Sequence, residues 1–187
     1  MVLTFSQPCL NMVLVLVLSF GEWVVIVNYK DLGKFRERHR DNRMVFCSGV
    51  FDLTHVRHAI FLDKCKQQGD MLVVMVGDDE SVRAYKGEGR PVLNQWVRLH
   101  MVDHLKPVDY CFVGPKPEGH LLGFVEYVLE HLRPDKYVVQ DDAFDLEKRR
   151  MMAERYGVEL VVIPKGGLFL EISTSYIVER IKRMAGI

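Results

Sequence analysis

The sequence lacks several features that would place it in a specialised class. Its 187 residues contain four widely spaced cysteines and no Cys-x-x-Cys pair. This spacing argues against a zinc ribbon or a disulfide framework and favours reduced thiols in a cytoplasmic protein. Lysine and arginine (25) balance aspartate and glutamate (25), so the charge predicts neither a nucleic-acid nor a membrane partner. Two local basic clusters, at 34–40 and 147–150, are interpreted as solvated helix faces.

Long uninterrupted apolar runs are also missing. The most apolar stretch, residues 10–27, is broken by Gly21 and Glu22 and falls short of the ~20 apolar residues that span a bilayer. It also lacks the basic start and the cleavage site of a signal peptide. Its valines and leucines favour strands or a packed extension. The alternative interpretation is that this segment anchors the protein at a membrane interface. We therefore expect an apolar N-terminal extension over residues 1–25, packed at the interface of a homodimer.

Beyond residue 43, short apolar runs typical of strands alternate with segments that have the period of a helix. We predict strands at 44–49, 71–77, 110–114, 136–140 and 158–163. We predict helices at 58–68, 79–85, 95–105, 121–132, 144–156 and 174–184. Near-continuous apolar strands separated by helices are typical of a parallel sheet covered on both faces. The predicted fold is α/β: a single Rossmann-like, doubly wound domain over residues 26–187, with a five-stranded parallel sheet.

Polar side chains gather where the first of these strands ends. The stretch "CSGVFDLTHVRH" (47–58) contains Gly49, Asp52, His55 and His58. If a helix begins near Thr54, the two histidines share one face of its first turn, beside unpaired backbone N–H groups and the positive end of the helix dipole. Such a turn attracts phosphate. A metal-binding pair is the alternative, but no third ligand lies nearby in the sequence.

The segment "GVFDLTHVRH" resembles the GxFDxxHxGH signature of the cytidylyltransferase-like nucleotidyltransferase superfamily. This superfamily includes heptose-phosphate adenylyltransferase domains, glycerol-phosphate cytidylyltransferases and archaeal FAD synthases. The resemblance covers roughly residues 26–187. It extends through "KGEGRPV" (86–92), Arg98, "LKPVDYCFVG" (105–114) and "EISTSYIVERIK" (171–182).

The resemblance implies a reaction and a set of site residues. An AMP or CMP moiety would pass from a nucleoside triphosphate to a phosphorylated small-molecule acceptor, a sugar phosphate or a polyol or alkyl phosphate, with release of pyrophosphate. Mg²⁺ would be bound mainly by the phosphates and by water. Catalytic roles are implied for His55, His58 and Lys86. Nucleotide contacts are implied for Gly49, Phe51, Asp52, Arg57, Arg98, Ser173, Thr174 and Ser175, and acceptor contacts are expected of Asp141 and Asp142.

The sequence departs from the family pattern at two places. Arg57 stands where the signature has glycine, and its guanidinium could block the nucleotide pocket, bind a base or phosphate, or point to solvent. Several relatives also carry an Arg-Thr-x-Gly run before the last motif, where this chain has "PKGGLFLEISTS" and Lys165 is the candidate cation. The alternative function is therefore a catalytically impaired module for nucleotide binding or oligomerisation.

Overall fold

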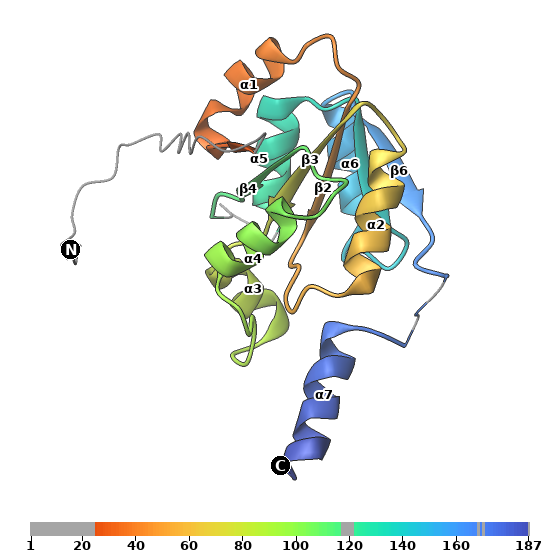
Figure 1. Cartoon of the computed structure of the whole chain (residues 1–187). Coiled ribbons are helices and arrows are strands. Elements are labelled where there is room, and N and C mark those ends of the chain that lie inside the picture. Colours follow the sequence, from red (N-terminus) through yellow and green to blue (C-terminus); the bar gives the residue numbers. More distant parts are fainter. Residues whose placement is uncertain (1–24, 117–121, 168, 170, 187) are drawn as a thin grey trace, which may run out of the picture.

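The computed structural model describes residues 25–116, 122–167, 169 and 171–186 (Figure 1). The predicted extension over residues 1–25 therefore lies almost entirely outside the described residues. The sheet contains β1 (Val25–Ile26), β2 (Met44–Gly49), β3 (Met71–Val76), β4 (Tyr110–Val113), β5 (Lys136–Gln140) and β6 (Glu159–Ile163). All pairings are parallel, and the strand order is β1-β4-β3-β2-β5-β6. The five predicted strands are confirmed, and the two-residue edge strand β1 is an addition to them.

Seven α-helices and one 3₁₀ turn are found in the described part of the chain. They are η1 (Tyr29–Asp31), α1 (Leu32–Arg38), α2 (Val56–Lys66), α3 (Asp79–Lys86), α4 (Gln95–Asp103), α5 (Gly123–Leu132), α6 (Leu146–Arg155) and α7 (Thr174–Ala185). The six predicted helices are confirmed to within a few residues at their ends. No helix among the described residues is both long and apolar enough to cross a membrane.

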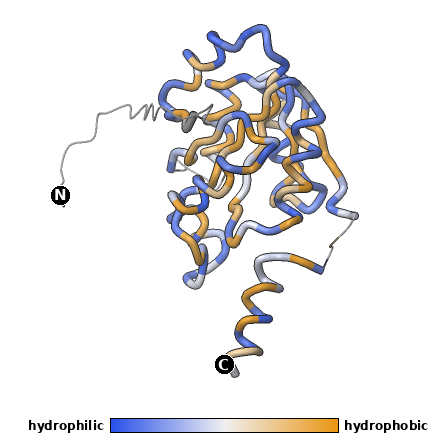
Figure 2. Tube along the Cα trace, viewed as in Figure 1, coloured by the Kyte–Doolittle hydropathy of each residue, from blue (hydrophilic) through white to orange (hydrophobic). Residues whose placement is uncertain are grey.

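Helices cover both faces of the sheet. Every residue of β3 is buried, and its alternate side chains enter two different hydrophobic clusters, as the two-residue period of a strand requires. One cluster contains side chains of α1, α5 and α6, and the other contains side chains of α2 and α4. The strands form the apolar interior of the molecule (Figure 2). The described cysteines Cys47, Cys65 and Cys111 are buried in it as free thiols.

The strand order reverses between β2 and β5. From β2 the chain proceeds through β3 to β4 on one side, and then returns to place β5 and β6 on the other. In open parallel sheets ligands bind at the carboxyl ends of the strands at such a reversal. The crevice is therefore expected after Gly49 of β2 and Gln140 of β5.

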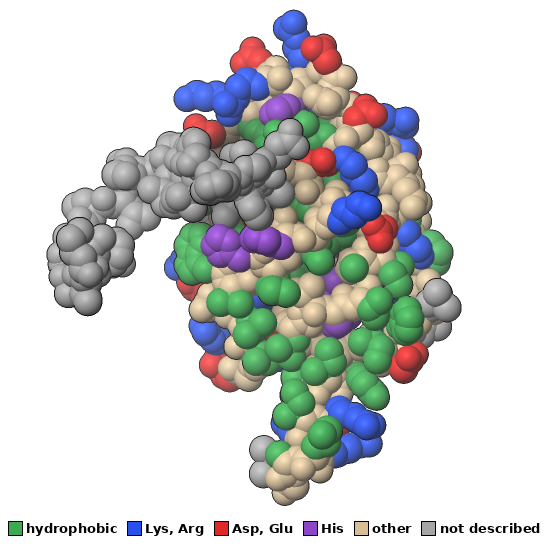
Figure 3. Space-filling view, in the orientation of Figure 1, with side chains coloured by type: hydrophobic (Ala, Val, Ile, Leu, Met, Phe, Trp, Pro, Cys, Tyr) green, Lys and Arg blue, Asp and Glu red, His purple; other side chains and the backbone are tan. Residues whose placement is uncertain are grey.

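Helix α7 projects away from the sheet (Figure 1). None of its residues is buried. Figure 3 shows hydrophobic side chains exposed along this helix, and basic and acidic side chains intermixed over the upper part of the same face. Ile181 and Met184 are among the exposed apolar side chains. The start of α7 is tied to the body through contacts described below.

Candidate active site

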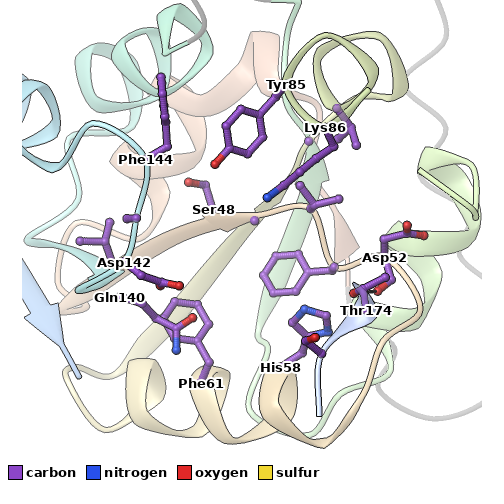
Figure 4. Close-up of a pocket in the computed structure, with 18 of the residues that line it drawn as sticks. Ser48, Asp52, His58, Phe61, Tyr85, Lys86, Gln140, Asp142, Phe144 and Thr174 are labelled. Atoms are coloured by element: carbon purple, nitrogen blue, oxygen red, sulfur yellow. Dashed lines mark hydrogen bonds between the residues drawn. The ribbon is translucent and has the colours of Figure 1, made fainter. Parts of the chain in front are cut away.

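A cavity of about 490 Å³ opens at the reversal of the sheet. This volume is within the range of small-molecule sites. Figure 4 shows His58, Asp52 and Thr174 on one side of it and Gln140, Asp142 and Phe144 on the other, with Ser48 and Lys86 between them. All the residues proposed from the sequence line the cavity except Arg98 and Asp141.

The corner between β2 and α2 brings the backbone close to the cavity. Phe51 and Leu53 have positive φ angles of 52° and 45°. The ring of Phe51 folds back so far that a Cβ atom on Gly49 would lie 2.9 Å from it. Real Cβ contacts are not this short, so a larger residue at position 49 would force the Phe51 ring to move. This gives a physical reason for the glycine of the signature.

Asp52 fastens this corner to a neighbouring loop. Its side chain is 1% exposed and accepts hydrogen bonds from Arg90 Nε (2.8 Å), Val92 N (2.9 Å) and Leu93 N (3.0 Å). Charge-assisted bonds of this kind are stronger than neutral ones. The carboxylate therefore orders the loop over residues 90–93, and its direct contact with a nucleotide stays a prediction.

His55 and His58 lie together at the start of α2. Their rings stack with centroids 3.9 Å apart, and the backbone N–H of His55 donates to Nδ1 of His58 at 3.4 Å. Since Nδ1 accepts, the proton of a neutral His58 is on Nε2, where it can be donated to a ligand. The Nδ1 atom of His55 is buried and has no hydrogen-bond partner among the described residues.

The environment of these rings keeps them neutral. Burial, followed by the charges of His55 and Arg57, lowers the pKa of His58 to about 3, against a smaller opposing effect of Asp52. Burial and then Arg57 also lower the pKa of His55. At neutral pH, His58 is therefore a neutral hydrogen-bond donor and not a cation.

The start of α7 is joined to the start of α2. Ser173 caps α7 through its hydroxyl. Thr174 Oγ1 donates to the backbone carbonyl of Asp52 at 2.7 Å, and Arg57 Nη1 donates to the carbonyl of Ile172 at 3.1 Å. Two helix N-termini thus line one cavity. Arg57 contacts the segment before α7, so the interpretation that it points freely to solvent is wrong.

Lys86 brings a cation to the same cavity from the end of α3. Figure 4 shows its side chain reaching into the cavity toward Ser48. Its ammonium lies 4.3 Å from the ring centroid of Tyr85, at cation–π distance. The ring of Tyr85 in turn contacts that of Phe144, with centroids 5.2 Å apart. This brings Lys86 and an aromatic pair to the same cavity that the two helix starts line.

Arg98 lies beneath the site and does not line it. Its fully buried guanidinium donates to the carbonyls of Leu93 (2.9 Å), Val50 (2.6 Å) and Gly77 (2.7 Å), and it pairs with Asp79 at 2.8 Å. These bonds hold together the loops that follow β2 and β3 and the loop before α4. The guanidinium donors are engaged within the protein. A contact between Arg98 and the nucleotide stays a prediction.

The two aspartates after β5 are both bound to Lys165. The backbone N–H of Lys165 donates to Asp141 Oδ1 at 3.1 Å, and its ammonium pairs with Asp142. Only Asp142 and Lys165 of these three line the cavity. Among the described residues no group of three or more His, Cys, Asp or Glu side chains is placed to hold a metal ion.

The sequence interpretation missed Arg149, which also lines the cavity. The interpretation of residues 147–150 as a solvated face is wrong for Arg149, which is 9% exposed. A signal was present in the sequence, because Arg149 lies three and four residues before Met152 and Ala153, the other buried residues of α6. The cavity also contains Ser48, Gln140 and Phe144, which no motif indicated.

Comparisons with known proteins agree with this geometry. A family profile described as cytidylyltransferase-like matches residues 46–180. Proteins named "Bifunctional protein HldE" are similar: the one from Geobacter sulfurreducens is 36% identical over 153 residues, and the one from Pseudomonas syringae pv. tomato is 34% identical over 146 residues. These alignments cover 80% and 78% of this chain but only 29% of each relative.

Two solved structures are similar in fold. A lipopolysaccharide core biosynthesis protein from Thermoplasma volcanium aligns with a TM-score of 0.54 and 27% identity, over 66% of this chain and 95% of that chain. A pantoate-beta-alanine ligase from Francisella tularensis, complexed with beta-gamma ATP and beta-alanine, aligns with a TM-score of 0.57 over 89% of this chain and 79% of that chain. At 13% identity, the second likeness is one of fold alone.

Proposed function

Because the chain belongs to the cytidylyltransferase-like family of nucleotidyltransferases, we propose that it transfers AMP or CMP from a nucleoside triphosphate to a phosphorylated small molecule. The observation that carries the proposal is the convergence of two helix N-termini on one cavity. The Thr174–Asp52 hydrogen bond joins the start of α7 to the corner that leads into α2. Free N–H groups and helix dipoles at both starts favour a bound polyphosphate.

The proposed step is a direct displacement at phosphorus. An oxygen of the acceptor phosphate attacks the α-phosphorus of the nucleotide, a new P–O–P bridge forms, and the bond to the β-phosphate breaks to release pyrophosphate. His58 donates the Nε2 proton as a hydrogen bond to a phosphate oxygen, and Lys86 neutralises charge nearby. Catalysis rests on positioning and on stabilisation of charge, without a covalent enzyme intermediate.

The residues present suit a Mg²⁺ ion that is bound through the triphosphate. The two carboxylates that line the cavity already have cationic partners, Asp52 with Arg90 and Asp142 with Lys165. A protein cage is therefore not required, since Mg²⁺ commonly keeps waters and binds through substrate phosphates. When bound, the ion supplies positive charge to the phosphate oxygens.

For the substrates, we propose ATP and a sugar phosphate as the first pair to test. The stretch 86–92 resembles heptose-phosphate adenylyltransferases, and a solved relative is named for lipopolysaccharide core biosynthesis. Such a core is built of sugars, which supports a sugar phosphate as acceptor. Polyol phosphates with CTP are the second pair.

Pyrophosphate release tests the proposal. Wild-type protein with Mg²⁺ should release pyrophosphate only when one nucleotide and one phosphorylated acceptor are both present. His58→Ala should reduce kcat/KM at least ~100-fold, the usual scale for a positioned charge-stabilising donor, with little change in the melting temperature. His100→Ala, at an exposed histidine of α4, is the matched control and should retain full activity.

Either of two results would count against this mechanism. Undiminished turnover by His58→Ala would remove the role given to the paired histidines. Nucleotide binding without turnover on any acceptor would favour the impaired module, in which Arg57 is the altered position. Against that alternative, Arg57 is one of the residues that line the cavity of about 490 Å³, so its side chain does not fill the cavity.

A further inference from the structure

The cavity contains a second cationic site, away from the helix starts. Arg149 of α6 lines the wall on the β5 side, and it is 9% exposed. It is hydrogen-bonded to Phe144 and to Tyr137 of β5. Figure 4 shows Phe144, with Gln140 and Asp142, across the cavity from His58 and Thr174. The proposed nucleotide contacts use the opposite wall and leave this arginine unassigned.

Hydrogen bonds hold the Arg149 guanidinium in one orientation. Nε donates to the carbonyl of Phe144 at 2.8 Å, and Nη1 donates to the hydroxyl of Tyr137. Tyr137 is fully buried, and its hydroxyl lies 3.5 Å from the hydroxyl of Ser48, which also lines the cavity. The chain thus fixes the arginine from two sides, and the Tyr137 hydroxyl links it to the hydroxyl of Ser48.

Arg149 has no counter-ion within the described part of the chain. No carboxylate there lies at ion-pair distance from it, and Nη2 makes no hydrogen bond. The carboxylate on the same wall, Asp142, is paired with Lys165 instead. A buried charge is costly unless it is paired. A guanidinium that is largely buried, held in one orientation and without a carboxylate partner beside a cavity is therefore suited to an anionic ligand.

We propose that Arg149 and Ser48 bind the phosphate group of the acceptor. A guanidinium fork matches two oxygens of a phosphate monoester, and the Ser48 hydroxyl can donate to a third. This assignment rests on the proposed transferase function. It adds a second anion subsite, on the wall opposite the proposed nucleotide contacts. It places the attacking phosphate on the β5 side of the cavity and the triphosphate at the starts of α2 and α7.

Phosphate binding and steady-state kinetics test the subsite together. Arg149→Gln should raise the acceptor KM and the dissociation constant of inorganic phosphate at least tenfold. The nucleotide KM should stay within about twofold. Arg149→Lys keeps the charge and should recover much of the loss. Arg150→Gln, at the exposed neighbouring arginine, should behave as wild type.

The outcomes separate the subsite from the transferase proposal. Turnover with an acceptor KM unchanged in Arg149→Gln would overturn the subsite and leave the transferase standing. Phosphate binding that requires Arg149, together with no turnover on any substrate pair, would support the subsite and overturn the transferase proposal. If Arg149→Gln does not fold, Ser48→Ala decides, because an unchanged phosphate affinity in that variant would overturn the proposal.

Discussion

His58 stays neutral at acidic pH values where a free histidine side chain would be protonated. Its burial, and then the charges of His55 and Arg57, favour the neutral ring, so its pKa falls to about 3. A neutral Nε2–H donor binds phosphate without a proton having to be gained first. The same environment makes the charged form of His58 unfavourable in the folded protein, and this links its titration to stability.

The stability of the protein should therefore depend on His58 below neutral pH. Between pH 6.5 and about 3 the unfolded chain binds a proton at this position that the folded protein does not, so the free energy of unfolding falls as pH falls. From pH 7 to pH 5 this loss should amount to about 2 kcal/mol. Urea unfolding of wild type and His58→Gln at both pH values measures it.

The His58→Gln protein should lose less stability over that interval, because a glutamine side chain does not titrate. His55 contributes in the same direction in both proteins, since its pKa is also lowered. His100→Gln should keep the full wild-type difference. Equal pH dependence in wild type and His58→Gln would contradict the assignment of this effect to His58.

Helix α7 depends on contacts of its first turn. The hydrogen bonds from Thr174 to Asp52 and from Arg57 to Ile172 connect it to the β2–α2 corner, while its remaining turns have no buried side chains. The position of this turn, where we propose that phosphate binds, is thus set by few bonds. Arg57, which departs from the family signature, supplies one of them.

Shortening Arg57 should affect the site more than the fold. In Arg57→Gly and Arg57→Ala the segment before α7 loses its bond to α2, and we expect nucleotide affinity to fall by about 3–10-fold. The unfolding free energy should change by about 1 kcal/mol, the scale of one hydrogen bond and of glycine in a helix. Titration calorimetry and urea unfolding measure the two effects.

The alanine variant is the cleaner of the two, because it removes the guanidinium without adding a helix-breaking residue. Arg180→Ala, on an exposed part of α7, should leave both quantities unchanged. A dissociation constant in Arg57→Ala equal to that of wild type would show that this side chain does not influence the pocket.

Much of this arrangement could be predicted from the sequence. Apolar runs and helical periods predicted the strands and helices, and two motifs predicted where α2 and α7 begin. Both kinds of signal can be read because they are local in the sequence. The edge strand β1 was missed because two residues carry no period. The burial of Arg98 and Arg149 could not be predicted for a different reason. Whether an arginine lines a cavity or lies beneath it depends on loops brought together from distant parts of the chain.

At the scale of the whole molecule, the cavity wall is assembled from segments that are distant in sequence. Ser48, Lys86, Gln140 and Thr174 reach it from β2, α3, β5 and α7. A ligand that contacts several of these walls binds only the folded protein and should stabilise all of it.

The homodimer expected from the sequence stays a separate prediction, to be measured by sedimentation.

Thermal unfolding with Mg²⁺ and each of ATP, CTP, GTP and UTP should identify the nucleotide. At ~100 times its dissociation constant a ligand adds about 2.7 kcal/mol, which corresponds to a rise of about 5–10 °C for a domain of this size. We expect one nucleotide to give this rise. If none does, nucleotide binding itself is absent and the transferase proposal fails at its first step.

The reversal of strand order also bears on how the chain folds. Met44 pairs with Met71, which follows soon after it, whereas Val45 pairs with Lys136 only after two further strands have been added on the other side. Closing the longer loop costs more entropy, so pairings of this kind slow folding. Since the cavity lies at the β2–β5 seam, the binding site is absent from any intermediate that contains only β2, β3 and β4. During synthesis, therefore, the protein acquires its pocket only after most of the chain has been made.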